Sequence, residues 1–217
     1  MLAAALGADL QRPLRLLCLG AHSDDIEIGC GGTLLRLLQE RPGTLVDWVV
    51  FSADDRREEE ARASAADFLR DAGDSEVIVQ RFRESYFPYI GDQIKDAFEG
   101  LKGRPTPDVV FTHRREDEHQ DHRTIADFTW NTFRNHLVLE YEIPKYEGDL
   151  GHPNLFVPLD ETIAERKVEL LMHHFGTQRS KAWFRPETFR AVMALRAVEC
   201  NVPAGWAEAF HVRKLVI

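Results

Sequence analysis

Two groups of histidines and carboxylates stand out as residues able to bind a metal ion. His22, Asp24 and Asp25 follow one apolar segment, and a cluster rich in the same residue types runs from His113 to His122 after another. Burying a histidine with two carboxylates is costly unless they bind something, and a cation suits such a set. Both groups come where an apolar segment ends, which in an open α/β sheet is the edge at which ligands bind.

The residue types indicate a catalytic metal. Taken together, His22, Asp25 and His122 supply two imidazoles and one carboxylate and leave at least one coordination position open. This is the donor set of a catalytic zinc site, in which the open position holds a water molecule of lowered pKa. Two histidines and a carboxylate also bind the iron of non-haem oxygenases, so Fe²⁺ is the alternative to Zn²⁺.

Three further residues stay free for acid–base chemistry. Asp24 is not needed as a ligand and is expected to act as the general base. His119 lies three residues before His122, so on a helix both side chains point the same way. As an imidazolium, His119 can polarise a carbonyl or protonate a leaving amine, and Asp121 can hold its ring in one tautomer.

Bringing these residues together requires a sheet, and the alternation of elements predicts one. Nearly continuous apolar runs are typical of strands buried on both faces, and segments with helical spacing lie between them. The pattern favours an α/β fold with a mostly parallel sheet and helices on both faces. Gly31 and Gly32 are interpreted as the turn before the first helix. Strands are expected at 14–20, 44–52, 77–80 and 108–112, and helices at 33–40, 58–72 and 92–101.

The rest of the chain continues the same domain. Two extended segments flank a loop rich in glycine and proline, and this loop could cover the site. We expect one domain over residues 1–217, with 1–13 as a flexible lead-in. The extended pieces are expected at 138–146 and 155–157, helices at 120–136, 160–175 and 187–200, and a last strand at 210–217.

Composition limits the classes of partner and compartment. The 217 residues carry a formal charge of −9, and an acidic surface disfavours nucleic acid as a partner. The cysteines at 18, 30 and 200 are odd in number and lack C-x-x-C spacing, which is typical of a reducing compartment. We find no signal peptide and no membrane span, so a cytoplasmic location is expected. A homo-oligomer is compatible with the long loop between 141 and 158.

The two motifs closely resemble those of the PIG-L/LmbE-like family of metal-dependent N-deacetylases. The family's usual form is A-H-P-D-D-E with glycines after it and, much later, H-P-D-H. Here residues 21–26 read A-H-S-D-D-I and residues 119–122 read H-Q-D-H. Ser23 and Ile26 depart from the usual form, but neither position is a ligand or the base. Arg57 with Glu60, and the A-E-A-F at 207–210, resemble further family elements.

The resemblance implies a Rossmann-like fold and a specific set of roles. Zinc would be held by His22, Asp25 and His122, with Asp24 as the general base. His119, paired with Asp121, would stabilise the oxyanion or act as the acid. The substrate would be a small N-acetylated sugar or sugar conjugate.

Arg57 is the best candidate for binding a hydroxyl or anionic group of the substrate. His113 is expected to be structural, and His211 is a weaker candidate for lining the site. Glu116 and Asp117 lie in a charged run and are expected to be solvated.

Two other functions stay open. A non-haem iron oxygenase fits poorly, because the alternating strands and helices do not match the many short strands of a jelly roll. A non-catalytic glycan-binding protein on the same fold is disfavoured by an intact base beside intact ligands, although fold alone does not determine function.

Overall fold

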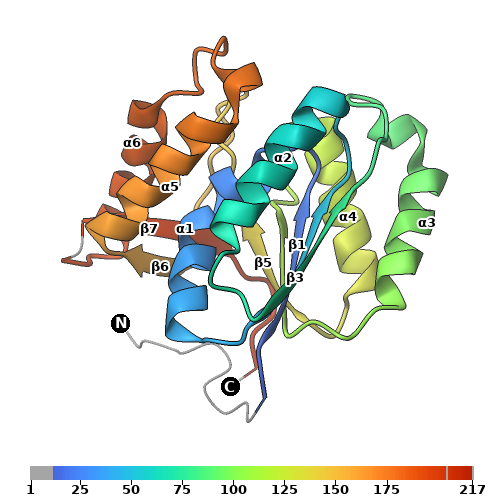
Figure 1. Cartoon of the computed structure of the whole chain (residues 1–217), viewed down its shortest axis with the longest axis horizontal. Coiled ribbons are helices and arrows are strands. Elements are labelled where there is room, and N and C mark those ends of the chain that lie inside the picture. Colours follow the sequence, from blue (N-terminus) through green and yellow to red (C-terminus); the bar gives the residue numbers. More distant parts are fainter. Residues whose placement is uncertain (1–11, 204, 217) are drawn as a thin grey trace.

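The predicted parallel strands belong to one sheet and occupy one side of it, with β3 at the edge. The computed structural model describes residues 12–203 and 205–216, and within them seven strands pair in the order β3-β2-β1-β4-β5-β7-β6 (Figure 1). Strands β1 to β5 run parallel, and β7 is antiparallel to both β5 and β6. The strands are β1 (Arg15–Gly20), β2 (Leu45–Val50), β3 (Asp74–Val79), β4 (Val109–His113), β5 (Leu137–Tyr141), β6 (Leu155–Leu159) and β7 (Trp206–His211).

Helices cover both faces of this sheet, so the predicted α/β fold is confirmed. On one face α5 contacts α1, α2 and α6, and on the other α3 packs beside α4 (Figure 1). A separate apolar core fills each side. The helices are α1 (Asp25–Glu40), α2 (Asp55–Phe68), α3 (Gly91–Lys102), α4 (Gln120–Thr132), α5 (Glu161–His174) and α6 (Pro186–Glu199).

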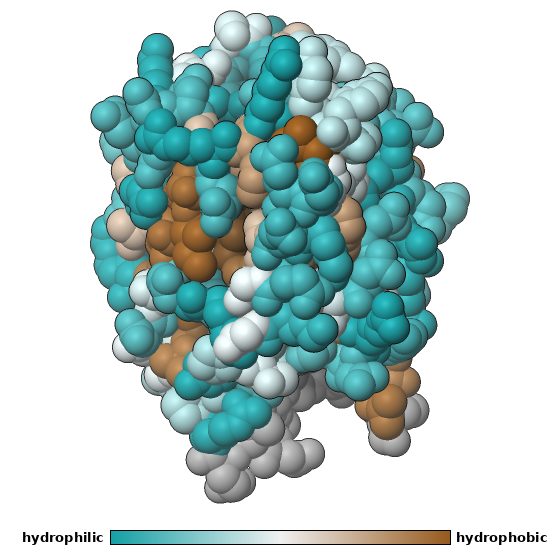
Figure 2. Space-filling model, turned by 90° about the vertical axis from the view of Figure 1, so that its right-hand side faces the viewer, coloured by the Kyte–Doolittle hydropathy of each residue, from teal (hydrophilic) through white to brown (hydrophobic). Residues whose placement is uncertain are grey.

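The surface carries an apolar hollow, and the length of the helices bears on whether the chain can cross a membrane. On the side that carries α3, apolar residues line a hollow between β2, β3 and α3 (Figure 2). Ile78 and Ala97 are partly exposed there, and Val49, Phe51 and Leu101 are buried. Among the described residues, no helix combines the length and the apolar character needed to cross a membrane.

The strand order explains why the two motifs can meet. After β1 the chain adds β2 and β3 on one side, then crosses over to add β4 on the other side of β1. Ligands bind at such a switch point, outside the carboxyl ends of the strands. His22 follows the end of β1, and His113 ends β4. The topology therefore places both motifs at one edge of the sheet.

The first helix begins eight residues earlier than predicted. Gly31 and Gly32 do not form a turn; they lie inside α1, which starts at Asp25. Close packing explains the glycines: a Cβ atom at Gly29 would come within 2.2 Å of the ring of Tyr141, and one at Gly31 within 2.6 Å of Phe68. These glycines let a strand and a neighbouring helix approach α1.

Smaller differences concern the ends of elements. Helix α2 starts at Asp55, because Asp54 caps it by accepting a hydrogen bond from the N–H of Arg57 at 2.8 Å. The last strand was expected at 210–217, but β7 spans Trp206–His211, so the prediction is wrong except at residues 210 and 211. Most of the predicted lead-in lies outside the described residues, but Arg12 is anchored, since its guanidinium donates to Asp108 at 2.7 and 2.8 Å.

A buried ion pair takes part in the hydrogen bonding of α1. The carboxylate of Glu208 in β7 accepts hydrogen bonds from the N–H groups of Gly32 and Thr33 at 2.8 and 2.7 Å. The ammonium of Lys167 in α5 donates to Glu208 and to the carbonyl of Ile28, both at 2.6 Å. In a regular α-helix the N–H of residue 32 bonds that same carbonyl. The ion pair therefore fastens the first turns of α1 to β7 and α5.

Replacing Glu208 by alanine would leave the buried ammonium of Lys167 unpaired. We expect the free energy of unfolding to fall by about 3–5 kcal/mol, the cost of breaking a buried pair by removing one partner. Urea unfolding measures the loss. Glu169, 3.8 Å from Arg166 and 66% exposed, is the matched control, and its replacement by alanine should leave stability almost unchanged. Equal stability of the two variants would contradict the role of the pair.

A second buried ion pair holds the chain after β5. The carboxylate of Glu142 lies between 2.8 and 3.0 Å from the guanidinium of Arg196 and accepts the N–H of Gly151 at 2.8 Å. Burial alone raises the pKa of Glu142. The ring of His211, whose Nε2 is 3.5 Å from Oε1, and the charge of Arg196 outweigh burial, so this pKa lies below its ordinary value.

The stability that Glu142 contributes should therefore depend on pH. A carboxyl whose pKa is lower in the folded protein stabilises the fold above its unfolded pKa of about 4.3, and this contribution is lost as the pH falls through the folded value. We expect Glu142→Gln to be less stable than the wild type at neutral pH and the difference to shrink below about pH 4. Urea unfolding across this range measures it; a pH-independent difference would refute the ionic contribution.

Candidate metal centre

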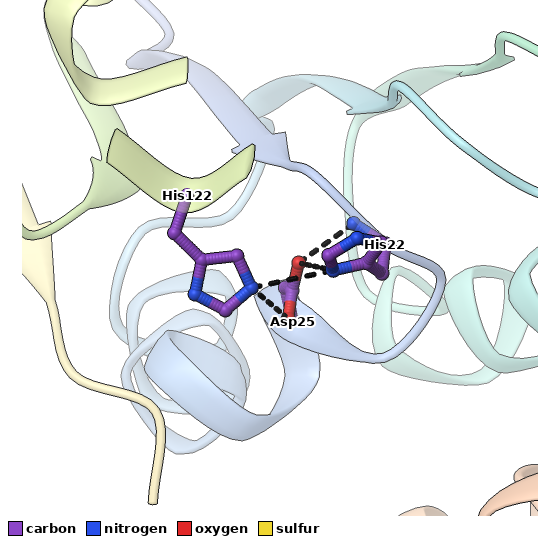
Figure 3. A group of neighbouring side chains, drawn as sticks. All are labelled: His22, Asp25 and His122. Atoms are coloured by element: carbon purple, nitrogen blue, oxygen red, sulfur yellow. Dashed lines mark hydrogen bonds and ion pairs between the residues drawn. The ribbon is translucent and has the colours of Figure 1, made fainter. Parts of the chain in front are cut away.

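Three side chains from two distant segments meet at the carboxyl ends of β1 and β4. His22 lies in the loop after β1, Asp25 begins α1 and His122 lies in the first turn of α4 (Figure 3). The Nε2 atom of His122 is 3.2 Å from Nδ1 of His22 and 3.5 Å from Oδ1 of Asp25. His22 Nδ1 is 3.4 Å from Asp25 Oδ2, and all three residues are buried. The structure thus brings together the three expected metal ligands.

The separations between these donor atoms suit a tetrahedral ion. Nitrogen and oxygen donors lie about 2.0–2.2 Å from zinc, and tetrahedral geometry then places neighbouring donors about 3.3–3.6 Å apart. Here the two nitrogen atoms are 3.2 Å apart, His22 Nδ1 is 3.4 Å from Oδ2 of Asp25, and His122 Nε2 is 3.5 Å from Oδ1 of the same carboxylate. Three donors leave one tetrahedral position open.

Each imidazole also has a carboxylate on its far nitrogen. Asp117 Oδ2 is 3.0 Å from Nδ1 of His122, and Asp121 Oδ2 is 3.2 Å from Nε2 of His22. Metal-binding histidines usually donate their remaining N–H to such a partner, which fixes the tautomer. With the protons placed in this way, His22 and His122 both offer a lone pair to the same point beside Asp25. The donor set therefore fits a metal ion.

The electrostatics of the cluster also favour a cation. Burial lowers the pKa of His22, but the charge of Asp25 and the hydrogen bond to Asp121 raise it to about 10. Burial and the charge of His113 lower the pKa of His122 to about 3. The pKa of Asp25 lies well below its usual range, because the surrounding histidines outweigh burial. Without a metal, a proton on His22 supplies the positive charge that the carboxylates require.

Asp24 is the carboxylate that the three donors leave free. It is the N-cap residue of α1, is buried, and makes no capping hydrogen bond with its side chain. Burial and the charge of Asp25 raise the pKa of Asp24, and the charge of Arg57 opposes them. A raised pKa brings a carboxylate closer to the working pH at which a general base is most effective.

Arg57 turns inward onto the first motif. Its Nε donates to Ser23 at 3.0 Å, Nη1 to Glu84 at 2.9 Å, and Nη2 lies 3.4 Å from Oδ1 of Asp24. The guanidinium therefore holds the loop that carries Asp24. Because Nη1 already donates to Glu84, a substrate anion would have to displace this carboxylate to accept a hydrogen bond from that nitrogen. Direct contact between Arg57 and a substrate stays a prediction.

His119 is the N-cap residue of α4, and its ring borders the cluster. Its Nδ1 accepts the N–H of Asp121 at 3.2 Å, so the neutral ring carries its proton on Nε2. The ring centroid is 5.0 Å from that of His22 and 4.5 Å from that of His122. Burial and the charge of His22 lower the pKa of His119. The site therefore favours a neutral hydrogen-bond donor here over an imidazolium.

The role expected for Asp121 needs correction. Only its backbone N–H contacts the ring of His119; its carboxylate contacts His22 and accepts the N–H groups of Ser85 at 2.6 Å and Phe87 at 3.2 Å. The expectation followed the general rule that a carboxylate near a histidine often fixes its tautomer. Helical geometry was assumed only for the direction in which His119 and His122 point. His119 precedes the helix with extended backbone, at φ −73° and ψ 123°, so helical spacing does not apply to it.

The expectation that Asp117 is solvated is wrong, whereas Glu116 is exposed as expected. Burial raises the pKa of Asp117, but the hydrogen bond with His122 and nearby positive charges outweigh burial and hold this pKa well below its usual range. The ammonium of Lys145, 3.0 Å away, also contacts it. Asp117 could have been found from its place just before the second motif. Lys145 comes from a distant loop, and no spacing in the sequence marks it.

His113 lies behind the three donors. Its ring stacks on His122, with centroids 3.9 Å apart, and its Nε2 is 3.2 Å from Asp25 Oδ2 and 2.9 Å from the backbone nitrogen of Ala21. His211 lies beside Glu142, with its Nε2 3.5 Å from Oε1. His113 thus packs against two of the expected ligands, and because it also groups with Asp117 and His122 as possible donors, its structural role stays a prediction.

Comparison with known proteins places these observations in a family. The sequence pattern of the PIG-L family, described as GlcNAc-PI de-N-acetylase, matches residues 17–133. An uncharacterized deacetylase of Escherichia coli K12, YaiS, is 30% identical over 188 residues, which cover 80% of this chain and 97% of that protein.

Two solved structures share the fold. The N,N'-diacetylchitobiose deacetylase of Pyrococcus horikoshii, complexed with its inhibitor MPG, has a TM-score of 0.67 and 20% identity, over 95% of this chain and 88% of that one. GalB, the 4-carboxy-2-hydroxymuconate hydratase of Pseudomonas putida KT2440, has a TM-score of 0.73 and 16% identity, over 94% and 98%. Because the family match spans both motifs and more than half of the sequence, the chain belongs to the PIG-L family.

Proposed function

We propose that the protein is a zinc-dependent hydrolase that removes the acetyl group from the nitrogen of a small amino sugar or sugar conjugate. The observation that carries the proposal is the set of three buried donors, His22, Asp25 and His122, with the unused buried carboxylate of Asp24 next to them in the chain. Fe²⁺ is the alternative metal. Membership of the PIG-L family and the activity named for YaiS support deacetylation. The sugar substrate is supported by the family description and by the name of the Pyrococcus enzyme.

Each residue of the site has a separate role in the proposed reaction. When bound, zinc would polarise the amide carbonyl and lower the pKa of the attacking water. Asp24 accepts a proton from this water as its oxygen attacks the amide carbon. His119 donates a hydrogen bond from Nε2 to the carbonyl oxygen, on which negative charge develops. The proton on Asp24 passes to the departing nitrogen, and acetate and the free amine leave.

The surrounding residues hold these groups in place. Asp117 and Asp121 orient the imidazoles of His122 and His22, and Arg57 restrains the loop that carries Asp24. Such partners matter because a reacting group displaced by about 1 Å can lower the rate by 10²-fold. The alternative of a non-haem iron oxygenase rested on the donor set alone. The mostly parallel α/β sheet differs from the jelly roll of short strands expected for such an enzyme.

Acetate release tests the reaction class. The protein loaded with Zn²⁺ is incubated with N-acetylglucosamine, N,N'-diacetylchitobiose and N-acetylated sugar conjugates, and free acetate and free amine are measured together. Equal amounts of both products support hydrolysis of the amide. Hydration of an unsaturated acid without acetate release from any acetylated sugar would instead favour the hydratase activity named for GalB.

Replacement of Asp24 by asparagine removes the base without removing a metal donor. We expect Asp24→Asn to bind Zn²⁺ as the wild type does and to lose about 10²–10⁴-fold in kcat, because a positioned acid–base group contributes this much. Asp71→Asn, at an exposed position in the turn after α2, is the matched control and should keep full activity. Full activity of Asp24→Asn would remove Asp24 from the mechanism.

Removal of the metal should affect stability as well as activity. A chelator should abolish acetate release, and Zn²⁺ should restore it. A Zn²⁺ concentration 100 times its Kd should stabilise the fold by about 2.7 kcal/mol, measured as a rise in Tm. His122→Ala should lose this stabilisation, while His173→Ala, at an exposed position in α5, should retain it. Equal stabilisation of both variants would place the metal elsewhere.

A further inference from the structure

A lysine from the loop between β5 and β6 reaches the carboxylate behind His122. The ammonium of Lys145 lies 3.0 Å from Oδ2 of Asp117, and the same oxygen is 3.0 Å from Nδ1 of His122. The side chain of Lys145 is only 6% exposed, although its neighbour Tyr146 is 72% exposed. The buried ammonium of Lys145 therefore contacts Asp117, which in turn contacts the expected metal ligand His122.

The same ammonium also fastens the loop to the second motif. Both carboxylate oxygens of Asp149 lie 2.7 Å from the Nζ of Lys145. Asp149 in turn accepts the N–H of Glu118 through its side chain at 2.7 Å and a hydrogen bond from Arg114 through its carbonyl at 2.6 Å. One buried cation thus joins the loop to the segment that leads into α4.

We propose that Lys145 is a positioning residue that couples the order of the loop at 142–154 to metal binding at His122. Without its ammonium, the carboxylates of Asp117 and Asp149 would share a buried site and repel each other. If the two carboxylates moved apart, the loop would lose its attachment to the second motif, and the hydrogen bond between Asp117 and His122 would be disturbed. The inference rests on the metal site of the proposed function, but it does not depend on the substrate.

The coupling has to act in both directions. If the loop helps to orient His122 for the metal, then the metal stabilises the loop by the same free energy. Partners that orient metal ligands typically change metal affinity by 10- to 100-fold when they are lost. Two independent quantities therefore report on the coupling, the affinity for Zn²⁺ and the protection of the loop from hydrogen exchange.

Lys145→Met tests both quantities, with Lys102→Met as the matched control. Lys102 lies at the end of α3 with its side chain 60% exposed. Competition with a chelating dye should show Zn²⁺ binding to Lys145→Met weakened by 10- to 100-fold, and binding to Lys102→Met unchanged. In the wild type, Zn²⁺ should slow amide exchange at 142–154, and in Lys145→Met this effect should be lost. Lys145→Arg, which keeps the charge, should recover part of both.

The outcomes separate this inference from the proposed function. A wild type that binds no Zn²⁺ would refute the metal site itself. Two results would contradict the coupling without contradicting the metal site. One is a Zn²⁺ affinity of Lys145→Met equal to that of the wild type, and the other is amide exchange at 142–154 in the wild type that does not change when Zn²⁺ binds. If Lys145→Met does not fold, Asp149→Asn replaces it. That variant keeps the contact between Lys145 and Asp117, so it should lose metal-dependent protection of the loop with a smaller change in affinity.

Discussion

The site depends on one constraint, which is that charges buried at the end of the sheet must each have a partner. Isolated buried charges are expensive, and several ionisable residues lie together here at the switch point between β1 and β4. Each imidazole that faces the candidate metal position has a carboxylate behind it, and one of these carboxylates also has a cation. The arrangement fixes which nitrogen atoms are free, and this in turn defines where a metal ion fits.

The same constraint explains features of the fold outside the site. The pair between Lys167 and Glu208 is buried as deeply as the candidate ligands and hydrogen-bonds to the backbone of α1. Because Asp25 lies in the first turn of this helix, the pair supports a candidate ligand at a distance. Gly29 has a related role, since only glycine lets the ring of Tyr141 approach the helix so closely. Packing and charge pairing together therefore set the direction in which α1 presents its N-terminus.

Much of the fold and the central part of the site could be predicted from the sequence, because local patterns encode them. Apolar runs located the strands, and the strand ends located His22, Asp25 and His122 at one edge of the sheet. The errors have physical causes. Gly31 looked like a turn because its packing partner, Phe68, lies in another helix. Asp121 was paired with His119, its near neighbour in the sequence, but its carboxylate contacts His22, which lies 99 residues away in the chain.

What local patterns could not reveal is the support supplied from far along the chain. The residues expected to do the chemistry lie between 22 and 122, within the segment that matches the family. Glu142, Lys145 and Lys167 lie beyond that segment, and their partners are settled only once the chain has folded. Glu208 belongs to the A-E-A-F at 207–210, which resembles a family element, but nothing in that pattern indicated its partner Lys167. Ligands and base must keep fixed types at fixed spacing, whereas a supporting cation can come from any loop that reaches the same point. This difference explains why the motifs can be recognised in a sequence and their supports cannot.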